Sequence, residues 1–205
     1  ELLDDNGNWI TVNFSEIEIG QLPDVDMTSD HIITGTDQDD TINQTYSGDP
    51  DGDEIDANDA ADGSNDDVIH AGAGNDFVWA GLGNDSVLGG AGDDHIWGGK
   101  GADTLDGGDG ADLLSYAGDA DGVNVNLATG SASGGYAEGD EFSNFENILG
   151  GVGNDTLTGD AGDNHLRGSN GDDELYGGDG NDHLDAENGN DTAYGEGGND
   201  TIHGF

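Results

Sequence analysis

The sequence predicts an all-β solenoid in which short strands stack into two parallel sheets around a thin apolar core. Three observations predict this fold. A nine-residue repeat fills most of the 205-residue chain, each repeat joins a glycine-rich stretch to a three-residue apolar pattern, and glycine supplies 40 positions. Two repeats form one coil turn with a strand on each side, and stacked turns place those strands in two parallel sheets.

The composition shows that a large core cannot hold this fold together. The chain has 47 acidic and 2 basic residues, a formal net charge of −45 and only 31% apolar residues. A chain of this kind is normally disordered, because it buries too little apolar surface to offset the loss of conformational entropy. It contains no cysteine, so disulfides and thiolate metal sites are excluded as well. A different stabilising interaction is therefore needed.

The same composition excludes several classes of protein. Nucleic acids and anionic membrane surfaces need a basic face, which Lys100 and Arg167 alone do not provide. No apolar run approaches the ~20 residues of a membrane span. The chain starts at Glu1 without a signal peptide, and we expect it to be a piece of a longer protein.

The repeat register is strict in two runs of six units, residues 62–115 and 150–203. Position 4 is glycine in every unit except one, where Asn65 stands, and position 6 is aspartate in every unit except one, where Asn164 stands. Position 8 is aliphatic throughout, if Ala193 is counted. Positions 1–6 therefore predict a tight turn, and positions 7–9 predict a strand whose central side chain points into the core. In the first run this core column is Ile69, Val78, Val87, Ile96, Leu105 and Leu114.

The register divides the chain into five segments. The blocks at Gly35 and Gly48 keep aspartate at position 6 and isoleucine at position 8, but they are out of phase with the first run, so their ion binding stays open. The segment between the runs ends in EFSNFENIL, a degenerate unit with Glu146 at position 6, and whether the stack continues through it stays open. The predicted segments are an N-terminal β segment or cap (1–34), irregular repeats with inserts (35–61), the first run (62–115), a linking β segment (116–149) and the second run (150–205).

The position-6 carboxylates indicate a bound cation. Stacking places those of units n and n+2 about 4.8 Å apart, which is one strand spacing. Carboxylates at that distance repel each other, so the arrangement requires a cation between them. Carboxylates and the carbonyls of glycine turns are oxygen ligands, which suit a hard cation, and a flexible oxygen set favours Ca²⁺ over Mg²⁺. Metal binding would then contribute directly to folding.

The repeat GGxGxDxUx resembles that of the RTX, or haemolysin-type calcium-binding, nonapeptide family. The resemblance covers both runs closely and residues 35–56 loosely. It implies a right-handed parallel β-roll, a calcium-stapled solenoid of nonapeptide repeats. It also implies that each ion takes the carbonyls of positions 2 and 4 and the aspartate of one unit. The same ion then takes the carbonyls of positions 1 and 3 and the aspartate of the unit two further on.

Six consecutive units offer four such pairs, so the resemblance implies about eight Ca²⁺ ions in the two runs and possible further ions in 35–61. Asn164 removes a charge from its ring and should weaken binding there, whereas Asn65 is expected to tolerate the turn conformation. The implied ligands of the first run are Gly63, Asn65, Asp67, Gly72, Gly74, Asp76, Ala80, Gly81, Leu82, Gly83, Asp85, Gly89, Gly90, Ala91, Gly92, Asp94, Gly98, Lys100, Asp103, Gly107, Asp109 and Asp112. Those of the second run are Gly151, Gly153, Asp155, Asp160, Gly162, Asn164, Gly168, Ser169, Asn170, Gly171, Asp173, Gly177, Gly178, Asp179, Gly180, Asp182, Ala186, Asn188, Asp191, Gly195, Gly197 and Asp200.

Other motifs have plainer explanations. Asp49–Asp56 resembles an EF-hand loop in part, but Glu54 stands where glycine is needed and no glutamate closes the loop. Five of the six histidines lie at outward strand positions, where surface placement explains them. Of these, His165 and His183 would be neighbours, able to bind adventitious Zn²⁺. No nucleophile elbow or HExxH motif occurs, so we expect no catalytic residues and no enzymatic activity in this chain.

One set of outward residues predicts an apolar patch on an otherwise acidic surface. Its members lie in alternate units and therefore on one sheet. A patch of this kind is typical of a docking surface for a neighbouring domain, a partner chain or a sugar, and simple cover of the sheet is the alternative. The residues of this aromatic patch are Phe77, Trp79, His95, Trp97 and Leu113.

Together these features predict a calcium-binding structural module of a secreted protein, which folds when Ca²⁺ binds outside the cell. The resemblance implies a Gram-negative bacterium and type I secretion. Two alternatives stay open: an adhesive or ligand-binding module, and the C-terminal folding and secretion appendage of an enzyme. That enzyme would be a protease, lipase or polysaccharide-modifying enzyme with its catalytic domain outside this chain. A disordered acidic calcium buffer is a third alternative, which leaves the register of aliphatic residues unexplained.

Overall fold

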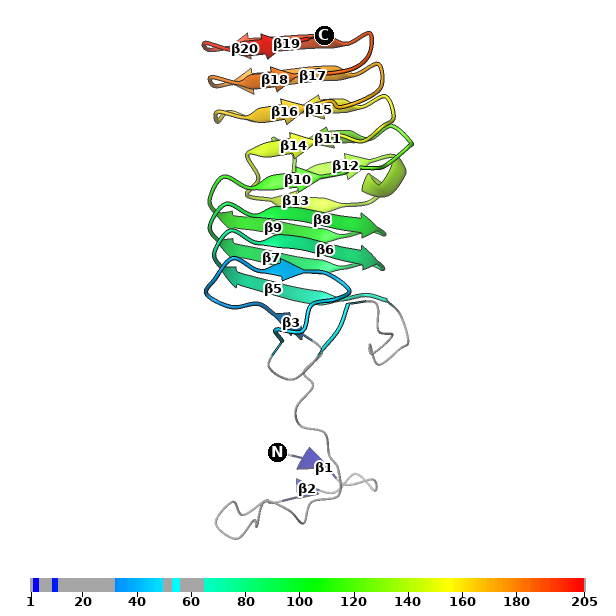
Figure 1. Ribbon diagram of the computed structural model, residues 1–205, viewed down its shortest axis with the longest axis vertical. Coiled ribbons are helices and arrows are strands. Elements are labelled where there is room, and N and C mark those ends of the chain that lie inside the picture. Colours follow the sequence, from blue (N-terminus) through cyan, green and yellow to red (C-terminus); the bar gives the residue numbers. More distant parts are fainter. Residues whose placement is uncertain (1, 4–8, 11–31, 50–52, 56–64, 205) are drawn as a thin grey trace.

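The computed structural model describes residues 2–3, 9–10, 32–49, 53–55 and 65–204. Within the long described stretch, short strands stack one above another along the longest axis (Figure 1). They form two large sheets, one of eight and one of ten strands, and almost all neighbouring strands are parallel. The predicted all-β, parallel β-roll is confirmed. Among the described residues, no helix has the length and apolar character needed to span a membrane.

The eight-stranded sheet is parallel throughout and runs in the order β20-β18-β16-β14-β10-β8-β6-β4. Successive strands of this sheet come from alternate repeat units, as expected for a coil with two units per turn. The strands are β4 (Thr41–Ile42), β6 (Phe77–Leu82), β8 (His95–Lys100), β10 (Leu113–Ser115), β14 (Asn147–Leu149), β16 (His165–Arg167), β18 (His183–Asp185) and β20 (Thr201–His203).

The ten-stranded sheet runs in the order β19-β17-β15-β11-β12-β13-β9-β7-β5-β3. It is parallel except at β12, which is antiparallel to both of its neighbours. The strands are β3 (Ile32–Thr34), β5 (Val68–Ala73), β7 (Ser86–Ala91), β9 (Thr104–Asp109), β11 (Asn124–Asn126), β12 (Ser131–Ser133), β13 (Glu141–Ser143), β15 (Thr156–Thr158), β17 (Glu174–Asp179) and β19 (Thr192–Gly197).

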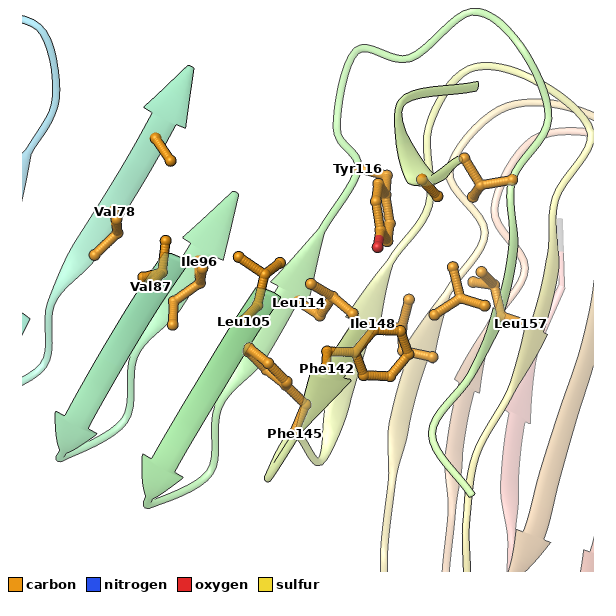
Figure 2. Packing of buried hydrophobic residues seen from close by; sticks show 14 of the residues in the cluster. Val78, Val87, Ile96, Leu105, Leu114, Tyr116, Phe142, Phe145, Ile148 and Leu157 are labelled. Atoms are coloured by element: carbon orange, nitrogen blue, oxygen red, sulfur yellow. The ribbon is translucent and has the colours of Figure 1, made fainter. Parts of the chain in front are cut away.

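The core is a double column of position-8 side chains between the two sheets (Figure 2). Strand alternation turns this one side chain inward and its two neighbours outward. Ile96 on one sheet and Leu105 on the other are fully buried, and each stacks on its equivalents in the next turns. The column ends at β20, where Ile202 is 47% exposed because no further strand covers it among the described residues.

The linking segment continues the stack, which answers the question left open by the sequence. Leu114 pairs with Ile148 in β14, and Ile148 pairs with Leu166, so the eight-stranded sheet passes through without a gap. In the other sheet β13 pairs with β9, and the hairpin β11–β12 is inserted beyond it. A 3₁₀ turn, η1 (Gly135–Ala137), follows the hairpin. Tyr116 is buried where this inserted segment meets the core (Figure 2).

The block at Gly35 joins the stack, and the interpretation that it is out of phase with the first run was wrong, because it begins 27 residues, or three repeat lengths, before Asp62. Its strand β4 pairs in parallel with β6, and Ile42 is fully buried at position 8 of this block. The 18 residues 44–61 that separate the block from Asp62 equal two repeat lengths, so the register is kept. The block at Gly48 forms no strand in its described residues, 48–49 and 53–55. Instead, the Asp49 and Asp53 carboxylates accept hydrogen bonds from the N–H groups of the edge strand β3.

Most of the N-terminal segment, 1–34, lies outside the described residues. Its described strands are β3 and the antiparallel pair β1 (Leu2–Leu3) and β2 (Trp9–Ile10).

Candidate metal-binding turns

The position-6 side chains form a hydrogen-bonded ladder along each edge of the stack. The backbone N–H of Asp76 donates to Oδ1 of Asp94 at 2.8 Å, and the N–H of Asp94 donates to Oδ1 of Asp112 at 2.7 Å. The same bond recurs along the other edge and in the second run, for example from Asp155 to Asp173 at 2.8 Å. The bond fixes one carboxylate oxygen and the side-chain rotamer, so the second oxygen, Oδ2, points in the same direction in every turn.

The second oxygen is buried and has no hydrogen-bond partner in six of these aspartates. A buried carboxylate oxygen without a partner is costly, because it has lost its water and gained nothing in return. Six repetitions at one position indicate that something outside the chain satisfies them. The six aspartates are Asp76, Asp94, Asp103, Asp112, Asp173 and Asp182.

The electrostatics agree with this geometry. Burial raises the pKa of Asp112 to about 6, and the negative charges of Asp94 and Glu146 add to the shift against an opposing backbone hydrogen bond. Burial likewise raises the pKa of Asp155 to about 6, although two N–H groups donate to it. In both cases the folded chain disfavours the charged carboxylate. A bound cation would reverse that preference.

Five of these six oxygens lie in a small cradle next to the position-1 glycine, whereas the unit of Asp76 has Ala71 at that position. A Cβ atom added to Gly89 would lie 2.5 Å from Asp94 Oδ2 and 2.5 Å from the carbonyl oxygen of Gly107, two units on. A Cβ on Gly177 would similarly meet Asp182 Oδ2 and the carbonyl oxygen of Gly195. Glycine therefore keeps open a space that oxygen atoms from two turns approach. An all-oxygen donor set of this kind suits Ca²⁺.

The glycine turns bring the remaining carbonyls into place. Gly90 and Gly92 have φ of 114° and 130°, values that L-residues rarely adopt. Cβ atoms at these positions would clash with the carbonyl oxygens of Gly72 and Gly74 in the preceding turn. The carbonyls of positions 2 and 4 therefore lie against the next turn, where the resemblance places their ion.

A protein-family comparison identifies these turns. The model of the RTX calcium-binding nonapeptide repeat (4 copies) matches residues 55–87, 62–96, 79–114, 88–123, 149–184 and 176–204, more than half of the chain. The chain belongs to this family. No curated protein matches the chain. The RTX repeat is a calcium-binding repeat, which agrees with the Ca²⁺ that the sequence predicts.

The structure brings the two halves of one implied RTX ligand set side by side. Gly72, Gly74 and Asp76 lie on the turn next to Gly89 and Ala91 of the following coil, since β5 and β7 pair through Gly72↔Gly90. Gly63 lies outside the described residues. The carbonyl of Asn65 lies against Gly83 in the same way that Gly74 lies against Gly92.

Asn164 differs from the other position-6 residues because protein groups bind both the oxygen and the nitrogen of its side-chain amide. Its Oδ1 accepts from the N–H of Asp160 at 2.8 Å, and its Nδ2 donates to the carbonyl of Glu146 at 3.0 Å. An amide lacks the charge of a carboxylate, and this one already has both partners. The geometry gives a physical reason for the weaker binding that the sequence predicts at this ring.

The segment between the two runs contributes two acidic residues to the position-6 ladder, of which the sequence analysis predicted one. Glu146 accepts from the N–H of Asp112 at 2.8 Å, as its degenerate unit predicts. Asp140 was missed: it accepts from the N–H of Asp103 at 2.9 Å and from the hydroxyl of Tyr116 at 3.0 Å. Burial raises the Asp140 pKa to about 7. The sequence contains the signal for this unit. In GYAEGDEFS (135–143), aspartate stands at position 6 and phenylalanine at position 8.

A second ladder, at position 5, was also missed. The N–H of Asp93 donates to Oδ1 of Asn75 at 2.9 Å, and the N–H of Ala111 donates to Oδ1 of Asp93 at 3.0 Å. This ladder runs in the direction opposite to that of position 6. Asparagine or aspartate stands at position 5 in ten of the twelve units, which is the signal that identifies it.

The aromatic patch forms on β6 and β8 as its register predicts. Trp79 stacks on Trp97 with ring centroids 4.7 Å apart, and Phe77 meets His95 edge to face at 4.8 Å. Leu113, on β10, lies beside His95 of β8 in the sheet. The structure adds one neighbour that the sequence did not predict: Tyr136 of η1 closes a groove beside the two tryptophans and lies under the Lys100 ammonium at 5.3 Å.

Proposed function

We propose that this chain is the calcium-dependent folding module of a secreted bacterial protein, exported unfolded and folded by extracellular Ca²⁺. The observation that carries the proposal is the row of buried Oδ2 atoms without hydrogen-bond partners, five of which face a glycine cradle. A chain of formal charge −45 that must bury these carboxylates is unstable without a counter-ion. The proposal assigns no reaction to this chain.

Each residue type has its own part in this function. The position-6 N–H holds Oδ1 of the next aspartate, so the ligand carboxylate is oriented before an ion arrives. The glycines present carbonyls at positions 1 to 4 and leave room in the cradle. Ca²⁺ supplies positive charge and accepts oxygen ligands from two turns at once. One set would be Gly72, Gly74 and Asp76 with Gly89, Ala91 and Asp94.

Calcium would therefore act as a switch for folding. An ion that binds only the folded roll stabilises it in proportion to the logarithm of its concentration. In low calcium, repulsion between carboxylates keeps the chain extended, which suits export by type I secretion from a Gram-negative cell. Millimolar calcium outside the cell then folds it. We expect about eight ions in the two runs.

A calcium titration tests the proposal. Circular dichroism should show a cooperative gain of β signal near millimolar Ca²⁺, and calorimetry should count close to eight ions, with little response to Mg²⁺. Asp94→Asn should raise the calcium midpoint, since it removes a charge shared by two neighbouring rings. Asp121→Asn removes the same charge from an exposed position of the linking segment and serves as the matched control. No change of signal, or equal binding of Mg²⁺, would contradict the proposal.

The groove beside the aromatic patch supports a second candidate function, a ligand-binding or adhesive module. Trp79 is 43% exposed although it is stacked on Trp97, and the indole N–H of Trp97 is buried without a partner. Tyr136 adds a third ring and Lys100 a positive charge. Exposed, flat aromatic faces suit a sugar ring.

A double substitution, Trp79→Ser with Trp97→Ser, separates this function from folding. We expect calcium-driven folding to be unchanged, because both side chains lie on the outer face of the sheet. Binding to an array of polysaccharides, measured on the calcium-loaded chain, should be lost. Loss of folding would show that the patch is structural cover, and absence of binding by the unaltered chain would contradict the sugar-binding function.

A further inference from the structure

The C-terminal end of the eight-stranded sheet carries a cluster of histidines that the calcium turns do not use. The cluster lies on the outer face of β16, β18 and β20, the last three strands of that sheet (Figure 1). Parallel register places His165 beside His183, and Asp185 beside His203. Leu184, between the outward residues of β18, points into the core. The outer positions of three successive coil turns therefore meet at one place.

Three ligand atoms in this cluster form a compact triangle. His183 Nε2 lies 3.2 Å from His203 Nδ1 and 3.3 Å from Asp185 Oδ1, and His203 Nδ1 lies 3.0 Å from the same oxygen. Ligand atoms around a tetrahedral Zn²⁺ ion with bonds of about 2.0–2.2 Å are spaced about 3.3–3.5 Å apart. The triangle is therefore close to the size of one face of a zinc coordination sphere.

Hydrogen bonds alone explain this triangle poorly. Each of the two ring nitrogens faces both the other nitrogen and the Asp185 oxygen. If both nitrogens carry a proton to donate to the carboxylate, the two N–H groups face each other across 3.2 Å. If only one does, the other nitrogen presents a lone pair to the carboxylate oxygen. A cation on the open side of the triangle satisfies all three atoms at once.

His165 completes the surroundings of Asp185. Its Nε2 lies 3.0 Å from Oδ2, the carboxylate oxygen outside the triangle, and its ring stacks on that of His183 at 4.4 Å. One ligand atom each from His165, His183 and Asp185 lies within 4.8 Å of the others. A ring that holds the second oxygen of a ligating carboxylate fixes its orientation, as supporting groups do around metal ions.

The basic side chain beside the cluster is paired with an acidic one, so it opposes a cation less. Arg167, in the same column on β16, is the only Arg or Lys in the second run, and its Nε is 3.3 Å from Glu187 Oε1. Asp185 is the half-buried centre of the cluster, with 20% of its side chain exposed, whereas His183 is 42% exposed. An ion from solvent can therefore reach the triangle, and water can complete its coordination.

We propose that His183, His203 and Asp185 form a site for a first-row transition-metal ion, with Zn²⁺ as the expected occupant. His165 is its positioning residue. Imidazole ligands suit Zn²⁺, Ni²⁺ and Cu²⁺, whereas Ca²⁺ takes oxygen ligands, so the two kinds of site select different ions. The ion would join β18 to β20, the edge strand whose Ile202 is uncovered. It thereby fastens the last turn of the roll.

The site is tested on the full chain in saturating Ca²⁺, so that folding is complete before zinc is added. Calorimetry with Zn²⁺ should show one site, and Co²⁺ should give the visible absorption of a tetrahedral complex with nitrogen ligands. His183→Ala with His203→Ala should weaken Zn²⁺ binding by at least about tenfold and remove the cobalt band. His165→Gln should give a smaller loss. His70→Ala, at an outward position of β5 far along the stack, should leave both signals unchanged.

The readouts also separate this site from the acidic turns. Zinc binding of unchanged affinity in the double variant would mean that Zn²⁺ binds the aspartate ladders, and the proposal would be wrong. Absence of a cobalt band in the unaltered chain would contradict it equally, even if the variant failed to fold. Amide exchange gives an independent check: Zn²⁺ should slow exchange in β20 and have no effect on β5.

Discussion

The two runs share one repeat but build position 2 of the turn differently. In the first run this position is always glycine, and its φ lies between 104° and 114° from Gly72 to Gly108. In the second run, Ser169, Glu187 and Glu196 occupy it with φ of 80°, 66° and 67°. At the glycine geometry a Cβ would meet the carbonyl of the previous coil. Ser169, Glu187 and Glu196 therefore take the tighter left-handed conformation, which L-residues adopt at a cost, whereas Asp160, the fourth non-glycine residue at this position, has no positive φ.

This difference extends to the strands. In the first run β5 to β9 each run for six residues, through positions 1 to 3 of the next turn. In the second run β15, β16 and β18 stop after three residues, each before a unit without glycine at position 2. Only β17, followed by Gly178, and β19 are long. Glycine at position 2 does not decide this alone, because β19 is long although Glu196 stands there and pairs with Gly178. β14 (Asn147–Leu149) is short although Gly151 follows it. The sheet pairing nevertheless extends into the turn more regularly in the first run, where every unit has this glycine.

Acid tests whether both runs depend on neutralised carboxylates, and we expect the largest effect here. Asp112 in the first run and Asp155 in the second both have a pKa of about 6, raised by burial from 3.8. A carboxyl with a raised pKa takes up a proton on folding, so its contribution to stability is complete below 3.8 and is lost as pH rises through about 6. The calcium-free chain should therefore gain β structure between pH 7 and pH 5, as measured by circular dichroism.

The calcium-loaded chain should show the opposite dependence, because protons compete with Ca²⁺ for the same oxygens. Its calcium midpoint should rise as the pH falls. Asp112→Asn, which mimics the neutral side chain, should weaken the pH response of the calcium-free chain. A calcium-free chain that stays unfolded from pH 7 to pH 5 would show that charge neutralisation alone does not replace the ion.

Position 8 offers a matched pair of substitutions, one in each run. Ile96 in β8 is fully buried, whereas Ile202 in β20 is 47% exposed at the open end of the column. Ile96→Ala should lower the free energy of unfolding by about 2–5 kcal/mol, the usual cost of emptying a buried isoleucine site. Ile202→Ala should cost less than about 1 kcal/mol, because its transfer from water is incomplete. Denaturant unfolding in saturating Ca²⁺ measures both, and equal losses would show that the last turn is covered in solution.

Most of the roll could be predicted from the sequence because the same nine-residue pattern recurs at a fixed spacing. One aliphatic residue at position 8 fixes which side chain faces inward, and one aspartate at position 6 fixes the edge ladder. The same regularity made the junction hard to predict. GYAEGDEFS and the shortened unit at Glu146 keep the two essential positions but change the spacing, so the continuity of the stack depends on pairing between strands far apart in sequence.

The side-chain clusters were predicted less completely than the turns. Placing His165 beside His183 needs only the coil period, which the sequence supplies. Including His203 and Asp185 requires the rotamers of position-9 side chains, and these depend on contacts rather than on register. Tyr136 is in the inserted segment, for which no repeat gives a position. Its place beside Trp97 follows from packing alone.

The smallest expected effect tests the position-2 comparison directly. Glu196→Gly removes a side chain held at φ of 67°, so the turn can relax towards the geometry of the first run. The gain in stability should be about 0.5–1 kcal/mol, since relief of left-handed strain is partly offset by the greater freedom of glycine in the unfolded chain. Glu196→Gln is the control: it removes the same charge but keeps the Cβ. If the two variants gain equally in saturating Ca²⁺, relief of charge repulsion explains the effect. If only the glycine variant gains, the side chain at position 2 strains the backbone of this turn, a strain that the glycines of the first run avoid.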